Sequence, residues 1–130
     1  AMPDWEALVE RALEQRRHAY APYSGFAVGA ALENADGRHF AGCNVENRTY
    51  GLTICAERSA LVQAVAAGAT DPVALVVATD ASPPATPCGQ CRDSLAEFVT
   101  DLPIVLVNTR GDRSERNLAE LLPEPFVLER

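Results

Sequence analysis

The stretch FAVGAAL, residues 26–32, decides the fold, because apolar residues occupy both of its alternating faces. Successive side chains of a strand point to opposite faces of a sheet. One face of this stretch carries larger apolar residues and the other carries only Ala27, Gly29 and Ala31. A strand of this kind is expected to be covered on both sides, and a helix layer on each face is the usual cover.

The neighbouring residues extend this strand into a hairpin. NADGR, residues 34–38, has the residues of a tight turn, and HFAGCNVE, residues 39–46, alternates again. The pattern predicts a β-hairpin closed at Asp36-Gly37.

Helical and strand-like segments alternate along the remaining chain. Asp4 is placed to cap a helix that runs to about His18 with one apolar stripe, and YAPYSG at 20–25 breaks it. Further helices are predicted at about 54–67 and within 88–99, and strands at 72–80 and 102–108. Residues 110–117 are a candidate edge strand, and 118–123 a last helical turn. This order predicts an α/β fold with one sheet between helices.

Composition predicts one soluble domain spanning residues 1–130. The chain has 130 residues, 48% hydrophobic and 22% charged, which suits a single core. Ala1 ahead of Met2 is interpreted as the remnant of an expression tag. The longest apolar stretch, VALVVA at 73–78, is too short to span a bilayer, and no leader precedes it. We therefore expect a cytoplasmic protein with no membrane partner.

Charge argues against a nucleic-acid partner. The formal net charge is −7, and the arginines are scattered rather than gathered in a basic stripe. A polyanion would be repelled by such a field. A small neutral substrate is the better match.

Three cysteines and one glutamate carry the predicted chemistry. TICAERSAL, residues 53–61, holds Cys55 and Glu57, and PCGQC, residues 87–91, holds Cys88 and Cys91. Each group lies where a connection ends and a helix begins, so the groups are expected to meet at one edge of the sheet. Helix starts favour thiolates, and three thiolates need a cation such as Zn²⁺, which then keeps a fourth position for water. A carboxylate beside that water is placed to handle its proton.

The C-x-E and P-C-x-x-C pattern is typical of zinc-dependent nucleoside and nucleobase deaminases. Four blocks extend the likeness: YAPYSGFAVGAAL, GCNVENRTYGLTICAER, PCGQCR and LLPEPF. Through them the chain resembles the small, free-nucleoside cytidine deaminase family over nearly its whole length. The resemblance implies a three-layer α-β-α sandwich around a mixed five-stranded sheet. It also implies deamination of cytidine and deoxycytidine in pyrimidine salvage.

The resemblance implies roles for the metal-site residues. Cys55, Cys88 and Cys91 would bind one Zn²⁺ per subunit, and Glu57 would be the general acid/base. Arg58 would hydrogen-bond zinc-bound thiolates and offset part of their charge.

Substrate contacts are also implied by the resemblance. Phe26 would lie beside the pyrimidine ring, and the backbone N–H of Ala56 would contact the base carbonyl. Asn44 and Glu46 would bind the ribose. If these two residues lie on a strand they share one face, with Val45 turned inward.

The family is generally homotetrameric, and Phe126 matches a phenylalanine that closes a neighbouring subunit's site. At Asp93 the chain departs from the family, which usually has glutamine there.

Other interpretations stay open at this point. The substrate could be a cytosine-nucleoside analogue such as a blasticidin-type antibiotic, or a polynucleotide, and the zinc site could be purely structural. Alone, the C-x-x-C pair could be a redox dithiol. Cys43 is explained as a buried thiol, and His18 and His39 as surface or helix-end residues. Phe126 could instead pin the tail to its own subunit, and Asn44 and Glu46 could be a solvated strand end.

Overall fold

The computed structural model describes residues 2–129, which form one mixed five-stranded sheet flanked by helices. The sheet order is β2-β1-β3-β4-β5; β3 and β4 are parallel, and the other neighbouring pairs are antiparallel. In chain order the elements are α1 (Trp5–Arg16), β1 (Gly29–Asn34), β2 (His39–Cys43), the 3-10 turn η1 (Tyr50–Leu52), α2 (Ala56–Ala66), β3 (Pro72–Thr79), α3 (Gly89–Ala96), β4 (Pro103–Asn108), β5 (Arg113–Asn117) and α4 (Leu118–Leu121).

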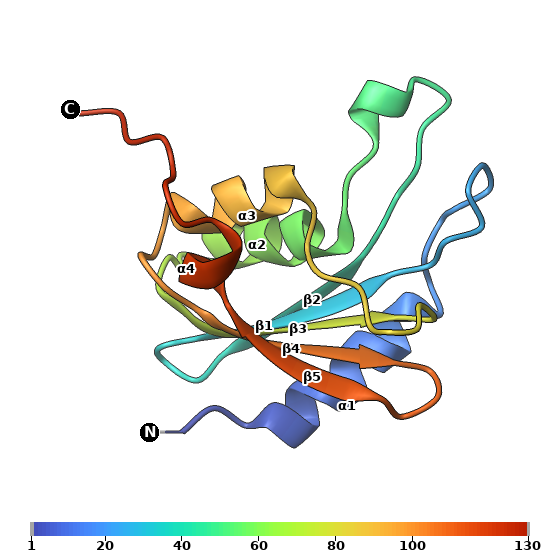
Figure 1. The fold of residues 1–130 in the computed structure, drawn as a ribbon, viewed down its shortest axis with the longest axis horizontal. Coiled ribbons are helices and arrows are strands. Elements are labelled where there is room, and N and C mark those ends of the chain that lie inside the picture. The colour runs from blue at the N-terminus through green and yellow to red at the C-terminus, as the bar shows by residue number, and fades with distance from the viewer. Residues whose placement is uncertain (1, 130) are drawn as a thin grey trace.

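Helices cover both faces of the sheet, which confirms the three-layer prediction (Figure 1). On one face, α1 packs on β1 and β3 with Leu8 and Ala12 fully buried. On the other face, α2, α3 and α4 share a second cluster that includes Leu61, Leu95 and Leu118. The two clusters are the two halves of the core.

Strand β1 lies at the centre because its small residues let both helix layers approach. Every residue of β1 is buried. Ala31 faces α1, whereas Ala30 and Leu32 belong to the cluster under α2. At Gly29 the backbone of α1 comes so close that no side chain fits in its place. The prediction that this strand is covered twice is therefore confirmed.

The first strand begins later than predicted. Its ladder starts at Gly29 rather than at Phe26. Before Gly29 the chain is held by a side chain: the backbone N–H of Val28 donates to Asn44 Oδ1, and Asn44 Nδ2 donates to the carbonyl of Phe26. The Asn44 side chain thus makes the backbone hydrogen bonds that a neighbouring strand would otherwise make with Phe26 and Val28.

The prediction that Asn44 and Glu46 share a strand with Val45 turned inward is wrong. Strand β2 ends at Cys43, and Val45 makes only isolated bridges, with Tyr20 and Ile54. Because those partners lie outside the sheet, no core covers Val45, and its exposed fraction is 45%.

The remaining elements follow the prediction with shifts at their ends. Asp4 caps α1 by accepting from the backbone N–H of Ala7, but the helix ends at Arg16, two residues early. Helix α2 starts at Ala56 instead of 54, which leaves Cys55 at its N-cap. The hairpin turn and the edge strand β5 are present as predicted. None of the helices in residues 2–129 combines the length and the apolar character needed to span a membrane.

We predict that Gly29→Ala destabilises the fold. Its new methyl group would overlap the carbonyl oxygen of Ala12 and lie 2.5 Å from the backbone nitrogen of Arg16. Forcing α1 away from β1 should lower the free energy of unfolding by about 1–3 kcal/mol, measured by urea denaturation. Gly51→Ala is the control, because nothing lies within 4 Å of its added methyl. Equal stability of both variants would contradict this packing.

Candidate active site

Two helix starts bring three thiols together, as the sequence predicts. Cys55 is the N-cap of α2, Cys88 is the N-cap of α3, and Cys91 follows in the first turn of α3. The Cys88 sulfur lies 3.6 Å from that of Cys55 and 3.5 Å from that of Cys91, and all three sulfurs lie within 4.8 Å of one another. Four sulfurs at the usual Zn–S length would be about 3.8 Å apart, so the donor set fits zinc.

The thiols compete for ionisation when no cation balances them. A hydrogen bond from Cys91, and further ones from Arg58 and Cys88, lower the pKa of Cys55 to about 5 despite partial burial. The same contact with Cys55, together with burial, raises the pKa of Cys91. One thiolate therefore forms easily, and full ionisation of the group calls for a bound cation.

Arg58 is directed at this group. Its Nη2 donates to the carbonyl of Thr53 at 3.1 Å and to the Cys55 sulfur at 3.8 Å. Its Nε is buried and has no hydrogen-bond partner among residues 2–129. A guanidinium in this position can offset part of the negative charge on the sulfurs.

Glu57 is buried next to the thiols. It stands at the second position of α2 with an exposed fraction of 5%. Burial raises the pKa of its carboxyl to about 7, and the charge of Cys55 acts in the same direction. A carboxyl with such a pKa can accept and release a proton near neutrality.

A cleft of about 170 Å³ opens over these groups. Six residues named by the sequence analysis line it: Phe26, Asn44, Cys55, Ala56, Glu57 and Cys88. Sequence reasoning missed the other lining residues, which are Val28, Thr53, Val77, Thr79, Ala85 and Thr86. Only two of these residues could have been found from the sequence. Thr79 ends a strand, and Thr86 directly precedes the P-C-x-x-C motif.

Asn44 lines the cleft while holding the backbone beside it. Its side chain bonds the amide of Val28 at 2.9 Å and the carbonyl of Phe26 at 2.7 Å. These bonds leave one N–H and part of the oxygen's accepting capacity for a ligand. The residue is therefore fixed in orientation rather than free at a strand end.

Glu46 does not line the cleft. Its carboxylate accepts from the backbone amides of Tyr23 and Ser24 at 2.9 and 3.1 Å and from the Ser24 hydroxyl. The Ser24 hydroxyl bond, with the two amides, lowers the pKa of this carboxyl. Glu46 thus secures the segment that carries Phe26.

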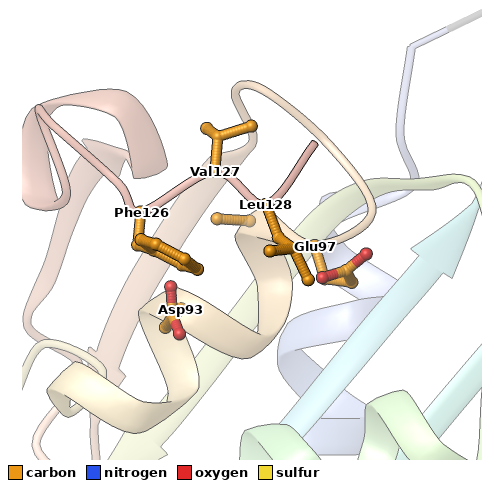
Figure 2. Close-up of a pocket in the computed structure, with 6 residues that line it drawn as sticks. Asp93, Glu97, Phe126, Val127 and Leu128 are labelled. Carbon is orange, nitrogen blue, oxygen red and sulfur yellow. The ribbon is translucent and has the colours of Figure 1, made fainter. Parts of the chain in front are cut away.

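Phe126 lies away from the cleft of its own chain. It lines a separate hollow over α3 with Asp93, Glu97 and Leu128 (Figure 2). Its exposed fraction is 81%, so its own chain hardly covers the ring. Asp93, where the resembled family usually has glutamine, therefore lies beneath the C-terminal tail and not among the three clustered thiols.

Known proteins share both the sequence and the fold. The family model described as the cytidine and deoxycytidylate deaminase zinc-binding region matches residues 2–107. Cytidine deaminase from Halalkalibacterium halodurans is 46% identical over 127 residues, covering 97% of this chain and 96% of the relative. The one from Sporosarcina psychrophila is 45% identical over 127 residues, covering 97% and 93%. A crystal structure of cytidine deaminase from Burkholderia pseudomallei matches with a TM-score of 0.90 and 46% identity, covering 96% of this chain and all of that one.

The chain belongs to the cytidine and deoxycytidylate deaminase family. The family's zinc-binding region includes all three clustered thiols. Among residues 2–129 they are the only group of three or more cysteine, histidine or carboxylate side chains arranged to hold a metal ion. Zinc is therefore the cofactor of this deaminase domain, and a redox dithiol is not needed to explain the C-x-x-C pair.

We predict that Cys55→Ala abolishes zinc retention, whereas Cys43→Ala leaves it intact. Cys55 supplies one of the three clustered sulfurs, and Cys43 lies outside the cluster at the end of β2. Zinc content after gel filtration, measured by elemental analysis, should be about one ion per chain for Cys43→Ala and far below that for Cys55→Ala. Full zinc content in both variants would exclude Cys55 as a ligand.

Proposed function

We propose that the protein catalyses hydrolytic deamination of cytidine and deoxycytidine to uridine and deoxyuridine, with release of ammonia. One observation carries this proposal: a buried glutamate lies beside three clustered thiols in a cleft of a cytidine deaminase family domain. Such a reaction serves pyrimidine salvage. Nothing in the similarities to known proteins favours an antibiotic-type substrate.

When bound, zinc would lower the pKa of a water molecule to near neutrality. Glu57 accepts the proton of that water and delivers it to ring N3 of the cytosine. It then takes the remaining proton of the attacking hydroxyl and gives it to the amine at C4, so that the C4–N bond breaks and ammonia leaves. The low exposure of Glu57 keeps bulk water away from this transfer.

The cleft walls would hold the nucleoside against the thiol group. Phe26 offers a ring face to the pyrimidine, and the N–H of Ala56 belongs to the first turn of α2, where no intrahelical acceptor exists. Asn44 retains capacity to bond a sugar hydroxyl. Glu46 reaches the sugar only if it exchanges part of its bonding to Ser24. Fixing the ring in this way holds C4 in line for attack.

Free nucleosides, rather than a polynucleotide, are the proposed substrates. A net charge of −7 would repel a nucleic-acid strand. Flipping a base out of a strand also needs a basic track around the site, and among residues 2–129 no lysine or arginine lines the cleft. We place this activity in the cytoplasm.

A homotetramer with shared sites is the proposed assembly. The cleft of one chain is about 170 Å³, below the roughly 300 Å³ at which ligand pockets usually begin. Apolar side chains are exposed on the tail and near the cleft, notably Tyr50, Leu52, Phe126 and Val127. Phe126 of one subunit would close the cleft of the next.

The direct test follows the loss of ultraviolet absorbance as cytidine is converted, with and without a strong chelator. Deoxycytidine and free cytosine are the comparison substrates. Both nucleosides should be consumed, free cytosine should react far more slowly, and chelation should stop turnover. Absence of turnover by zinc-loaded protein would refute the proposal and leave a non-enzymatic zinc module.

We predict that Glu57→Gln lowers kcat by at least about 10²–10⁴-fold while zinc stays bound. The amide retains the shape of the carboxyl but cannot carry the proton. Glu10→Gln, on the exposed side of α1, is the matched control and should be unaffected. Activity near that of the parent in Glu57→Gln would eliminate the mechanism.

We predict that hybrid oligomers recover activity from two impaired subunits. Phe126→Ala should raise KM without changing the unfolding temperature of the isolated subunit, because the ring is almost unburied there. Co-expressing Phe126→Ala with Glu57→Gln subunits gives mixed sites that contain both an intact glutamate and a neighbour's phenylalanine. Sites of normal KM should then appear in the hybrids. If the hybrid shows only the KM of Phe126→Ala, the tail serves its own subunit.

A further inference from the structure

Arg92 makes a three-way contact that the proposed reaction does not use. It follows Cys91 in α3 and lies partly buried. Its Nε donates to the carbonyl of Pro87 at 2.7 Å, its Nη2 to the Thr86 hydroxyl at 3.0 Å, and its Nη1 to the carbonyl of Leu121 at 2.9 Å. One planar group therefore joins the loop before α3 to the end of α4.

The first two contacts fix the residues directly before a thiol of the metal group. Pro87 is fully buried and precedes Cys88, the N-cap of α3. The backbone N–H of Arg92 also donates to the carbonyl of Cys88 at 3.0 Å. Arg92 thus bonds two successive carbonyls, one through its side chain and one through its main chain. These bonds set the direction in which the chain enters Cys88.

Charge does not explain the arrangement. Within residues 2–129 no carboxylate lies close enough to the Arg92 guanidinium to form an ion pair. Its three acceptors are neutral oxygens spread around the plane of the guanidinium. The planar guanidinium has N–H donors that point in several fixed directions and can reach all three oxygens, whereas a lysine ammonium is a single compact donor group.

We propose that Arg92 is a positioning residue of the metal site, which holds the Thr86–Cys88 segment so that the Cys88 sulfur meets those of Cys55 and Cys91. The inference rests on the proposed zinc site and adds a residue that touches neither metal nor substrate. The bond to Leu121 extends the effect, because it fixes the point from which the tail with Phe126 leaves the domain.

The test compares Arg92→Gln, Arg92→Lys and Arg38→Gln with the parent protein. Arg38 is the matched control: it too donates to a backbone carbonyl, that of Ala67 at 3.0 Å, but at the hairpin turn. The first readout is the rate at which the zinc-loaded protein releases its metal to a chromophoric chelator. The second is the visible spectrum of the cobalt-substituted protein, which reports the geometry of the sulfur ligands.

Both Arg92 variants should release zinc about tenfold faster or more and should shift the cobalt bands. Arg92→Lys keeps the charge and loses the fork, so it should resemble Arg92→Gln. Arg38→Gln should match the parent in both readouts even if its thermal stability falls. With cytidine, the Arg92 variants should lose mainly kcat.

Parent-like metal release and cobalt spectra in Arg92→Lys would overturn the proposal, because charge alone would then suffice. The same changes in Arg38→Gln would also overturn it, since they would reflect general loosening. Neither metal readout uses cytidine. Failure of the parent to deaminate cytidine would refute the proposed function while the role of Arg92 is still tested.

Discussion

Repulsion between sulfur anions is the constraint on which the site depends. Two helices must begin close together, with Cys55 as the N-cap of α2 and Cys88 as the N-cap of α3, and Cys91 must lie in the first turn of α3. Helix starts supply unpaired N–H groups and a favourable dipole, which reduce the cost of one thiolate but not of three. A divalent cation balances the remaining charge, and Arg58 offsets the excess that three thiolates leave. The sheet serves this geometry, because α2 and α3 lie on the same face of it and share one apolar cluster (Figure 1).

The two residues expected to bind the sugar also hold the segment that forms one wall of the cleft. Asn44 supplies the hydrogen bonds that a strand partner would have given to Phe26 and Val28, and Glu46 fastens Tyr23 and Ser24. Substituting either residue therefore disturbs the position of Phe26 as well as any sugar contact. A large effect of such a substitution does not by itself prove contact with substrate. Comparing the rates on nucleosides with the rate on free cytosine is more selective. A disturbed wall would slow both kinds of substrate, whereas a lost sugar contact would slow only the nucleosides.

Periodicity and motif spacing predicted much of this molecule. The layers, the hairpin, the edge strand and the meeting of three thiols follow from local pattern, because each needs only alternation, turn residues or helix starts that the sequence displays. The extent of β1 and the exposure of Val45 could not be predicted. They depend on a carboxamide that replaces strand pairing and on bridges to residues distant in the chain. The role of Arg92 could not be predicted for the same reason. Its place in the motif is visible in the sequence, but two of its acceptors come within reach only once the loop and α4 are folded against α3.

The groups around the site differ in exposure. Cys91 is fully buried, Glu57 is 5% exposed and Asn44 is 8% exposed, whereas Cys88 is exposed, Phe26 is 39% exposed and Phe126, outside the cleft, is 81% exposed. Groups that hold charge and move protons need a fixed, dry setting before substrate arrives, because reorganising them during reaction would raise the barrier. Groups that enclose the sugar must let it enter and leave. The proposed assembly fits this distribution, because Phe126 of a neighbouring subunit would cover the open side at Phe26 without moving the buried Glu57 and Cys91.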